Sequence, residues 1–192
     1  MDFGLKMTDL VLKMMNFVRS SSDPGSQDGL GRTYRWLNLE KQAPLYPFGF
    51  GASYSQWAYS DLKLSALTSQ CGTVTATATV TNSGGVDGSE VSQLYLANEA
   101  PSYGAAARWR LAGFERLDLK AGKSATVSFE LPPLARAEVR ASDAARWLAS
   151  STFSVYVGGG QPKQLPQHAT SNVLHATLLS HGAAQSLASC KT

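Results

Sequence analysis

The sequence predicts an all-β protein, an antiparallel β-sandwich preceded by an extended strap. Three observations carry this prediction. Apolar and polar residues alternate with a period of two in several segments, clusters of Gly, Asn, Ser and Pro separate these segments, and about seven short strands result. The 192 residues suffice for one ordinary domain plus tails, and 43% of them are hydrophobic and can form a core.

Composition and cysteine usage narrow the classes of function. The 17 Lys and Arg residues exceed the 14 Asp and Glu residues by three, and they are scattered, which gives nucleic-acid binding little support. No stretch approaches the roughly 18 consecutive apolar residues of a membrane span. Cys71 and Cys190 are too few for a disulfide framework or a zinc site. They either form one bridge in an oxidising compartment or remain free thiols, and free thiols are the simpler interpretation.

Residues 1–30 form an N-terminal segment. Its first 19 residues carry apolar side chains at helical spacing, which predicts an amphipathic helix. These side chains are Phe3, Met7, Leu10, Met14 and Phe17. The segment lacks the basic start and small-residue cleavage site of a secretory signal. Residues 20–29 are rich in Ser, Asp, Pro and Gly, which predicts a loop.

Residues 31–57 read as an extended connecting strap. Pro44 and Pro47 disfavour a continuous helix, and Gly49 and Gly51 permit close approach of the backbone to another surface. An extended segment must bury its aromatic rings against something larger than itself, so we interpret it as a docking strap. Its candidate docking residues are Arg32, Tyr34, Trp36, Tyr46, Phe48 and Phe50.

Residues 58–180 form the strand-rich body. The clearest strand is 73–81, where Val and Ala alternate with Thr. Further strands are predicted at 62–66, 89–97, 111–119, 125–131, 153–157 and 171–180. Their number and spacing are typical of a sandwich of immunoglobulin or fibronectin type III shape. Residues 143–149 form either a short helix or a loop in which Trp147 fills the core, and residues 181–192 are expected to be a flexible tail.

Residues 89–97 carry apolar side chains on both faces of the predicted strand. Val91 and Tyr95 fall on one face, and Leu94 and Leu96 on the other. A second body is therefore expected to cover the outer side of this strand.

The sequence contains no recognisable catalytic or cofactor motif. The nearest pair of carboxylates, Asp87 and Glu90, lies at a predicted hairpin turn, where we expect Asp87 to cap the backbone and Glu90 to face solvent. We expect no catalytic, metal-binding or cofactor-binding residue. Tyr103 and Trp109 lie in a loop and are candidates for contact with a sugar or a neighbouring domain. Burial of Trp109 at the sandwich edge or against a neighbour is the favoured alternative.

Several ordered motifs resemble glycoside hydrolase family 3, the β-glucosidases and β-xylosidases. Residues 31–36, GRTYRW, and 45–54, LYPFGFGASY, resemble the family signature GRTYRF…YPFGxGLSY. Residues 80–95 resemble VxNTGxxxGxEVxQLY, residues 111–117 resemble LKGFERV, and residues 155–159 resemble the last strand. Ala52 stands where Leu is usual, and Ser150-Ser151-Thr152 replaces a common turn.

The resemblance implies the C-terminal fibronectin type III-like domain of such an enzyme. In that family the aspartate nucleophile and the acid/base glutamate belong to preceding domains, so no catalytic residue transfers to this chain. The implied partners are those catalytic domains and β-glycans such as xylan, and the implied location is extracellular, although no signal peptide is seen. The alternative functions are a stand-alone glycan- or protein-binding module and a purely structural domain. We expect the chain alone to be inactive and its strap to promote self-association.

Overall fold

The computed structural model describes residues 33–36, 44–104, 107–163 and 171–190. The chain divides into two compact units, residues 1–44 and 45–192, so the expected 31–57 strap falls partly in each. In the first unit the described helix is α2 (Thr33–Trp36), a single turn. The helix predicted at the start of the chain lies outside the described residues.

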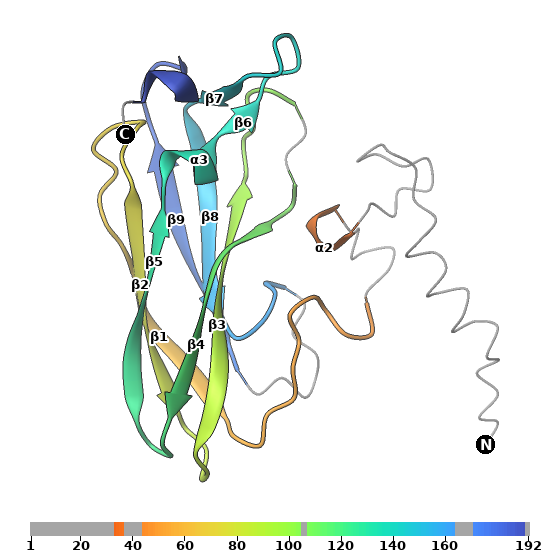
Figure 1. Cartoon of the computed structure of the whole chain (residues 1–192), viewed down its shortest axis with the longest axis vertical. Helices are drawn as coiled ribbons and strands as arrows, with labels where there is room; N and C mark the ends of the chain where they lie inside the picture. The colour runs from red at the N-terminus through yellow and green to blue at the C-terminus, as the bar shows by residue number, and fades with distance from the viewer. Residues whose placement is uncertain (1–32, 37–43, 105–106, 164–170, 191–192) are drawn as a thin grey trace, which may run out of the picture. The chain divides into compact units, whose positions relative to one another are not determined.

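The second unit is a sandwich of two antiparallel sheets, which confirms the predicted fold class (Figure 1). One sheet has the order β1 (Trp57–Leu64), β2 (Val74–Asn82), β5 (Ser124–Leu131). The other has the order β4 (Arg110–Leu119), β3 (Gly88–Asn98), β8 (Ser151–Gly158), β9 (Val173–Ser180). A small third sheet joins β10 (Gln185–Ser186), β7 (Arg146–Leu148) and β6 (Glu138–Val139). The turns α3 (Pro133–Arg136) and η1 (Leu187–Ser189) complete the elements.

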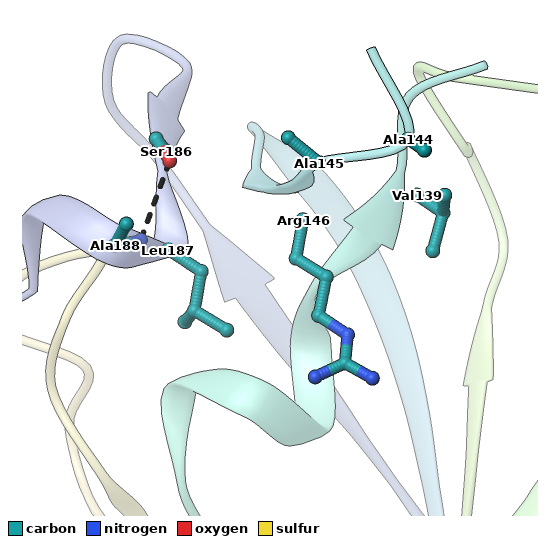
Figure 2. A pocket seen from close by; sticks show the side chains of 7 residues that line it. All are labelled: Val139, Ala144, Ala145, Arg146, Ser186, Leu187 and Ala188. Carbon is teal, nitrogen blue, oxygen red and sulfur yellow. Dashed lines mark hydrogen bonds between the residues drawn. The ribbon is translucent and has the colours of Figure 1, made fainter.

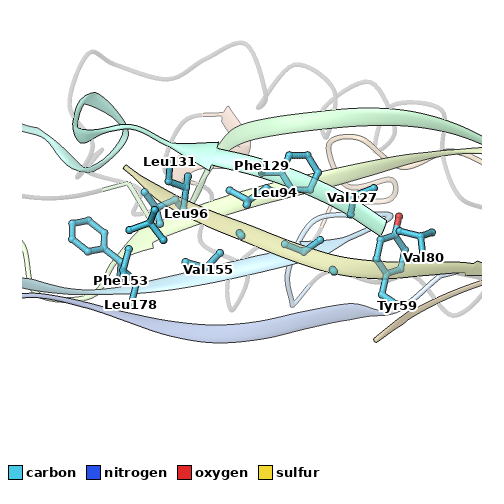
Figure 3. Packing of buried hydrophobic residues seen from close by; sticks show 14 of the residues in the cluster. Tyr59, Val80, Leu94, Leu96, Val127, Phe129, Leu131, Phe153, Val155 and Leu178 are labelled. Atoms are coloured by element: carbon cyan, nitrogen blue, oxygen red, sulfur yellow. The ribbon is translucent and has the colours of Figure 1, made fainter. Parts of the chain in front are cut away.

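The core fills the space between the two main sheets. Along β2 every second residue from Val74 to Val80 is buried, while the intervening threonines lie partly exposed. Figure 3 shows Val127 and Phe129 of β5 in one buried cluster with Leu94 of β3 and Val155 of β8. Strict alternation of this kind is what a strand with one buried face requires.

The turn between β2 and β3 depends on one buried side chain, Asn82. Its Oδ1 accepts hydrogen bonds from the Ser55 hydroxyl and from the Gly84 backbone N–H (3.1 Å). Its Nδ2 donates to the backbone oxygens of Val86 (2.8 Å) and Leu119 (3.1 Å). Asn82 therefore satisfies its whole hydrogen-bonding capacity while it ties both sheets to the turn.

Two expectations about the end of the sandwich that carries β6, β7 and β10 are wrong. Residues 143–149 form neither a helix nor a core plug, because a turn leads into β7, where Leu148 is buried and Trp147 is only half-buried. Residues 185–189, expected in a flexible tail, form β10 and η1, and β10 pairs with β7. The pairing is only two residues long, so periodicity in the sequence does not reveal it.

The structure also corrects the interpretation of the two cysteines. Cys71 and Cys190 form a disulfide, with their Cα atoms 5.3 Å apart and a sequence separation of 119 residues. The bridge fastens the C-terminal segment to the loop between β1 and β2. A bridge between positions so distant in sequence constrains the unfolded chain strongly.

Reduction of this disulfide is expected to lower the free energy of unfolding by about 2–5 kcal/mol, because the unfolded chain gains the conformational freedom of a long loop. Urea unfolding of the oxidised protein, with and without dithiothreitol, measures the difference. The Cys71→Ser/Cys190→Ser variant should match the reduced protein and be insensitive to dithiothreitol. Equal stability of all three forms would contradict the expected constraint.

Candidate interaction surface

Strand β3 is buried on both faces over residues 92–97. Leu94 and Leu96 belong to the core, while Gln93 and Tyr95, on the outer face, are also buried. Part of the expected cover on this face comes from the chain itself, because the Gln93 side chain contacts the segment before β1. The Tyr95 hydroxyl donates to Gln93 Oε1 over 2.6 Å, which fixes the orientation of the amide.

Residues 45–50 form a turn that Gln93 holds in place; we call it the docking turn. The Phe50 N–H donates to the Pro47 carbonyl over 3.0 Å and closes the turn. Gly49 adopts a φ of 76°, a conformation that favours glycine. Gln93 Nε2 donates to the Gly49 carbonyl over 3.1 Å and to the Gly159 carbonyl over 3.4 Å. The docking turn is therefore anchored to β3 and to the end of β8.

The docking turn directs large apolar side chains to solvent. Tyr46 is 67% exposed and Phe48 is 46% exposed, while Pro47 between them is buried. Tyr46 stacks on Phe50 with ring centroids 5.4 Å apart. Leu45 is also largely exposed. Exposed apolar side chains gathered in one place are a feature of surfaces that contact another protein.

The adjoining strand β4 extends this apolar surface. Phe114 lies directly opposite Gln93 in the register of β3 and β4, so its side chain points to the same outer face, where it is 71% exposed. We define the docking face as Leu45, Tyr46, Phe48 and Phe114. Phe114 was not predicted from the sequence, although it falls on the outward-facing positions of β4 that it shares with Arg116 and Asp118.

The remaining strap residues belong to the other unit. Tyr34 and Trp36 are half-buried within α2, and Arg32 lies outside the described residues. The structure therefore groups Tyr46, Phe48 and Phe50 in the docking turn, and their association with the first three strap residues stays a prediction.

Tyr103 and Trp109 occupy different environments. Trp109 is only 5% exposed, so it offers no face to a ligand and matches the alternative in which it packs at the sandwich edge. Tyr103 is half-buried and packs against Trp147, with ring centroids 6.3 Å apart. The Arg140 guanidinium lies 3.7 Å from the Trp147 ring centroid and also pairs with Asp143. Because the guanidinium covers a face of Trp147, that face is closed to stacking with a sugar.

The two carboxylates at the β2–β3 turn have different hydrogen-bond partners. Asp87 accepts a hydrogen bond from the Ala121 N–H over 2.9 Å and so caps a neighbouring turn, as expected. Glu90, expected to face solvent, is instead half-buried and accepts a hydrogen bond from the buried Tyr59 hydroxyl over 3.0 Å. Burial raises the pKa of Glu90 to about 7, although the Tyr59 and backbone hydrogen bonds oppose this shift. Burial also raises the pKa of Tyr59, and the neighbouring Glu90 adds to the shift.

A shallow pocket lies at the end of the sandwich that carries β6 and β7 (Figure 2). Apolar and small side chains line most of it, and Arg146 contributes the charged group. Its other wall is η1 and the adjacent Ser186, whose Oγ accepts from the Ala188 N–H. This lining contains no carboxylate that could act as a general acid or base.

Within the described residues, no three His, Cys, Asp or Glu side chains gather closely enough to hold a metal ion. The same part of the chain contains no helix with the length and apolar character needed to span a membrane.

Comparison with known proteins is consistent with this geometry. Residues 90–161 match the family model of the fibronectin type III-like domain. The periplasmic β-glucosidase of Salmonella typhimurium is 44% identical over 93 residues, which are 48% of this chain and 12% of that protein. The β-xylosidase of Formosa agariphila is 37% identical over 132 residues, 68% of this chain and 18% of that protein.

A solved structure gives the same result. The Bifidobacterium adolescentis GH3 β-glucosidase superimposes with a TM-score of 0.66 at 29% sequence identity, over 77% of this chain and 20% of that one. This chain therefore carries a fibronectin type III-like domain and is similar to the C-terminal regions of glycoside hydrolase family 3 β-glucosidases and β-xylosidases. It spans only about a fifth or less of the length of these relatives.

Gly49→Ala is expected to displace the docking turn, because the added Cβ would collide with Gln93 Oε1 at a φ that disfavours alanine. The Phe50 amide should then exchange with deuterium at least about tenfold faster, since its hydrogen bond to Pro47 opens. Gly51→Ala is the matched control, because a Cβ there meets open space. Unchanged exchange in Gly49→Ala would contradict the anchoring by Gln93.

Glu90→Gln is expected to flatten the pH dependence of stability. The carboxyl has a pKa of about 7 in the folded protein against an ordinary value of 4.5, so the folded state retains the proton between these pH values. Stability should therefore fall as pH rises through this window and level off above it, by about 1 kcal/mol after allowance for solvent screening. The variant should be the more stable form at pH 8. Exposed Glu130→Gln is the control, and an unchanged profile in Glu90→Gln would refute the assignment.

Proposed function

We propose that this chain is the accessory C-terminal part of a family 3 glycoside hydrolase that acts on β-glucosides or β-xylosides. Its role is to pack against the catalytic domains and stabilise them, while the catalytic carboxylates belong to those domains. The docking face supports this proposal most directly. Gln93 anchors the docking turn through a hydrogen bond, yet Tyr46 and Phe114 remain largely exposed.

Apolar groups held in a fixed conformation favour a protein partner. Ordering costs little when such a surface binds, because the turn is already hydrogen-bonded. Burial of each large side chain then contributes about 1.5–3 kcal/mol. The disulfide agrees with a protein that functions in an oxidising compartment, and one relative is a periplasmic β-glucosidase.

A fusion tests this proposal. The catalytic part of the Salmonella typhimurium β-glucosidase, cut before its matched region, would be joined to this chain. We expect the fusion to hydrolyse nitrophenyl β-glucoside and to unfold at a higher temperature than the truncated enzyme. The chain by itself should give no turnover.

The Tyr46→Ser/Phe48→Ser fusion should lose most of the gain in unfolding temperature, because the docking face no longer buries its aromatic rings. Leu134→Ser/Val139→Ser is the matched control, since both of these apolar residues are exposed elsewhere on the sandwich. An equal gain in unfolding temperature for the two double variants would contradict docking through this face. Binding of free xylan by the isolated chain, lost in Tyr103→Ala, would favour the glycan-binding alternative.

A further inference from the structure

Arg136 is a buried cation whose side chain is only partly satisfied. It ends α3 and is 3% exposed. Its Nη2 donates to the backbone oxygens of Gln70 (3.0 Å) and Gly72. Its Nε and Nη1 are buried and have no hydrogen-bond partner among the described residues. Backbone carbonyls carry only partial charge, so they do not neutralise the guanidinium.

The described part of the chain supplies no counter-charge to Arg136. The two ion pairs among the described residues are Arg116–Asp118 and Arg140–Asp143, and both lie on the surface. Burial lowers the pKa of Arg136, as expected for a cation without a carboxylate partner. A buried ion without a partner costs several kcal/mol, so such groups are normally paired.

A second unsatisfied donor lies beside Arg136. Gln70, whose carbonyl accepts from Arg136, is also buried. Its side-chain Oε1 accepts from the Ser180 hydroxyl over 2.8 Å, which leaves Nε2 buried without a partner. Three unsatisfied nitrogen donors, Arg136 Nε and Nη1 and Gln70 Nε2, therefore occur on two residues that are joined by the hydrogen bond from Arg136 Nη2 to the Gln70 backbone carbonyl.

The unsatisfied donors of Arg136 and Gln70 favour an anion as the ligand. All three unsatisfied groups are donors, and one side chain carries a full positive charge, so the fitting ligand accepts hydrogen bonds and carries negative charge. A monovalent ion balances a single guanidinium, whereas sulfate or phosphate would leave excess negative charge in a buried place. Halides meet both conditions and have no donor of their own to satisfy.

We propose that Arg136 and Gln70 form a binding site for a chloride ion between α3 and the β1–β2 loop. The site is held in shape by covalent structure, because Cys71 lies between Gln70 and Gly72 and is bridged to Cys190. Chloride bound there stabilises the fold and links α3 to the disulfide-bonded loop. The site is separate from the docking face and does not depend on the proposed enzymatic role.

Thermal unfolding of the whole chain tests the site. Sodium chloride would replace sodium gluconate at constant ionic strength, and the midpoint temperature would be recorded up to 0.5 M, roughly the range in which weak sites saturate. We expect a saturable rise of about 2–5 °C in the native protein. Arg136→Met should abolish the rise, while exposed Arg116→Met should retain it.

Bromide provides a direct second measurement that needs no variant. Crystals of the native protein grown in sodium bromide should show an anomalous scattering peak within hydrogen-bond distance of Arg136 Nε or Nη1. A midpoint that is independent of chloride, or an equal rise in Arg136→Met, would overturn the proposal. So would bromide crystals in which only water or no density lies beside Arg136.

Discussion

The burial of β3 on both faces is the constraint from which the other features follow. Leu94 and Leu96 place one face in the core, so the sandwich cannot form without this strand. On the opposite face Gln93 fixes the docking turn through the Gly49 carbonyl. A buried amide must satisfy its hydrogen bonds, and it does so only with this turn, Tyr95 and the end of β8 in place. The same strand thus determines both the fold and the surface offered to a partner.

The two ends of the sandwich have different chemical character. Toward the β2–β3 turn, the buried Asn82 and the half-buried Glu90 join the sheets through hydrogen bonds. Near α3, the buried Arg136 holds the β1–β2 loop, and the disulfide joins that loop to the C-terminal segment. In both regions these groups join elements of the sandwich that are distant in sequence, so they contribute to its stability.

Much of the fold could be predicted from the sequence, because alternation over eight or more residues defines a strand such as β2 without ambiguity. Short elements could not be predicted in this way. The two-residue pairing of β10 with β7 and the disulfide of Cys71 depend on contacts between distant parts of the chain. For the candidate site, the exposed rings of Tyr46 and Phe48 and the favoured burial of Trp109 were predicted, but the packing of Tyr103 against Trp147 was not. Nothing local in a loop sequence distinguishes an aromatic ring that covers an edge from one that faces solvent.

Hydrogen–deuterium exchange gives the most direct test that the outer face of β3 and β4 receives the catalytic domains. Exchange of the chain alone would be compared with exchange of the same chain fused to the catalytic part. The account predicts slower exchange in residues 45–50 and 110–116 of the fusion, with residues 138–148 unchanged. Slower exchange confined to residues 138–148 would contradict it, since the partner would then contact the other end of the sandwich.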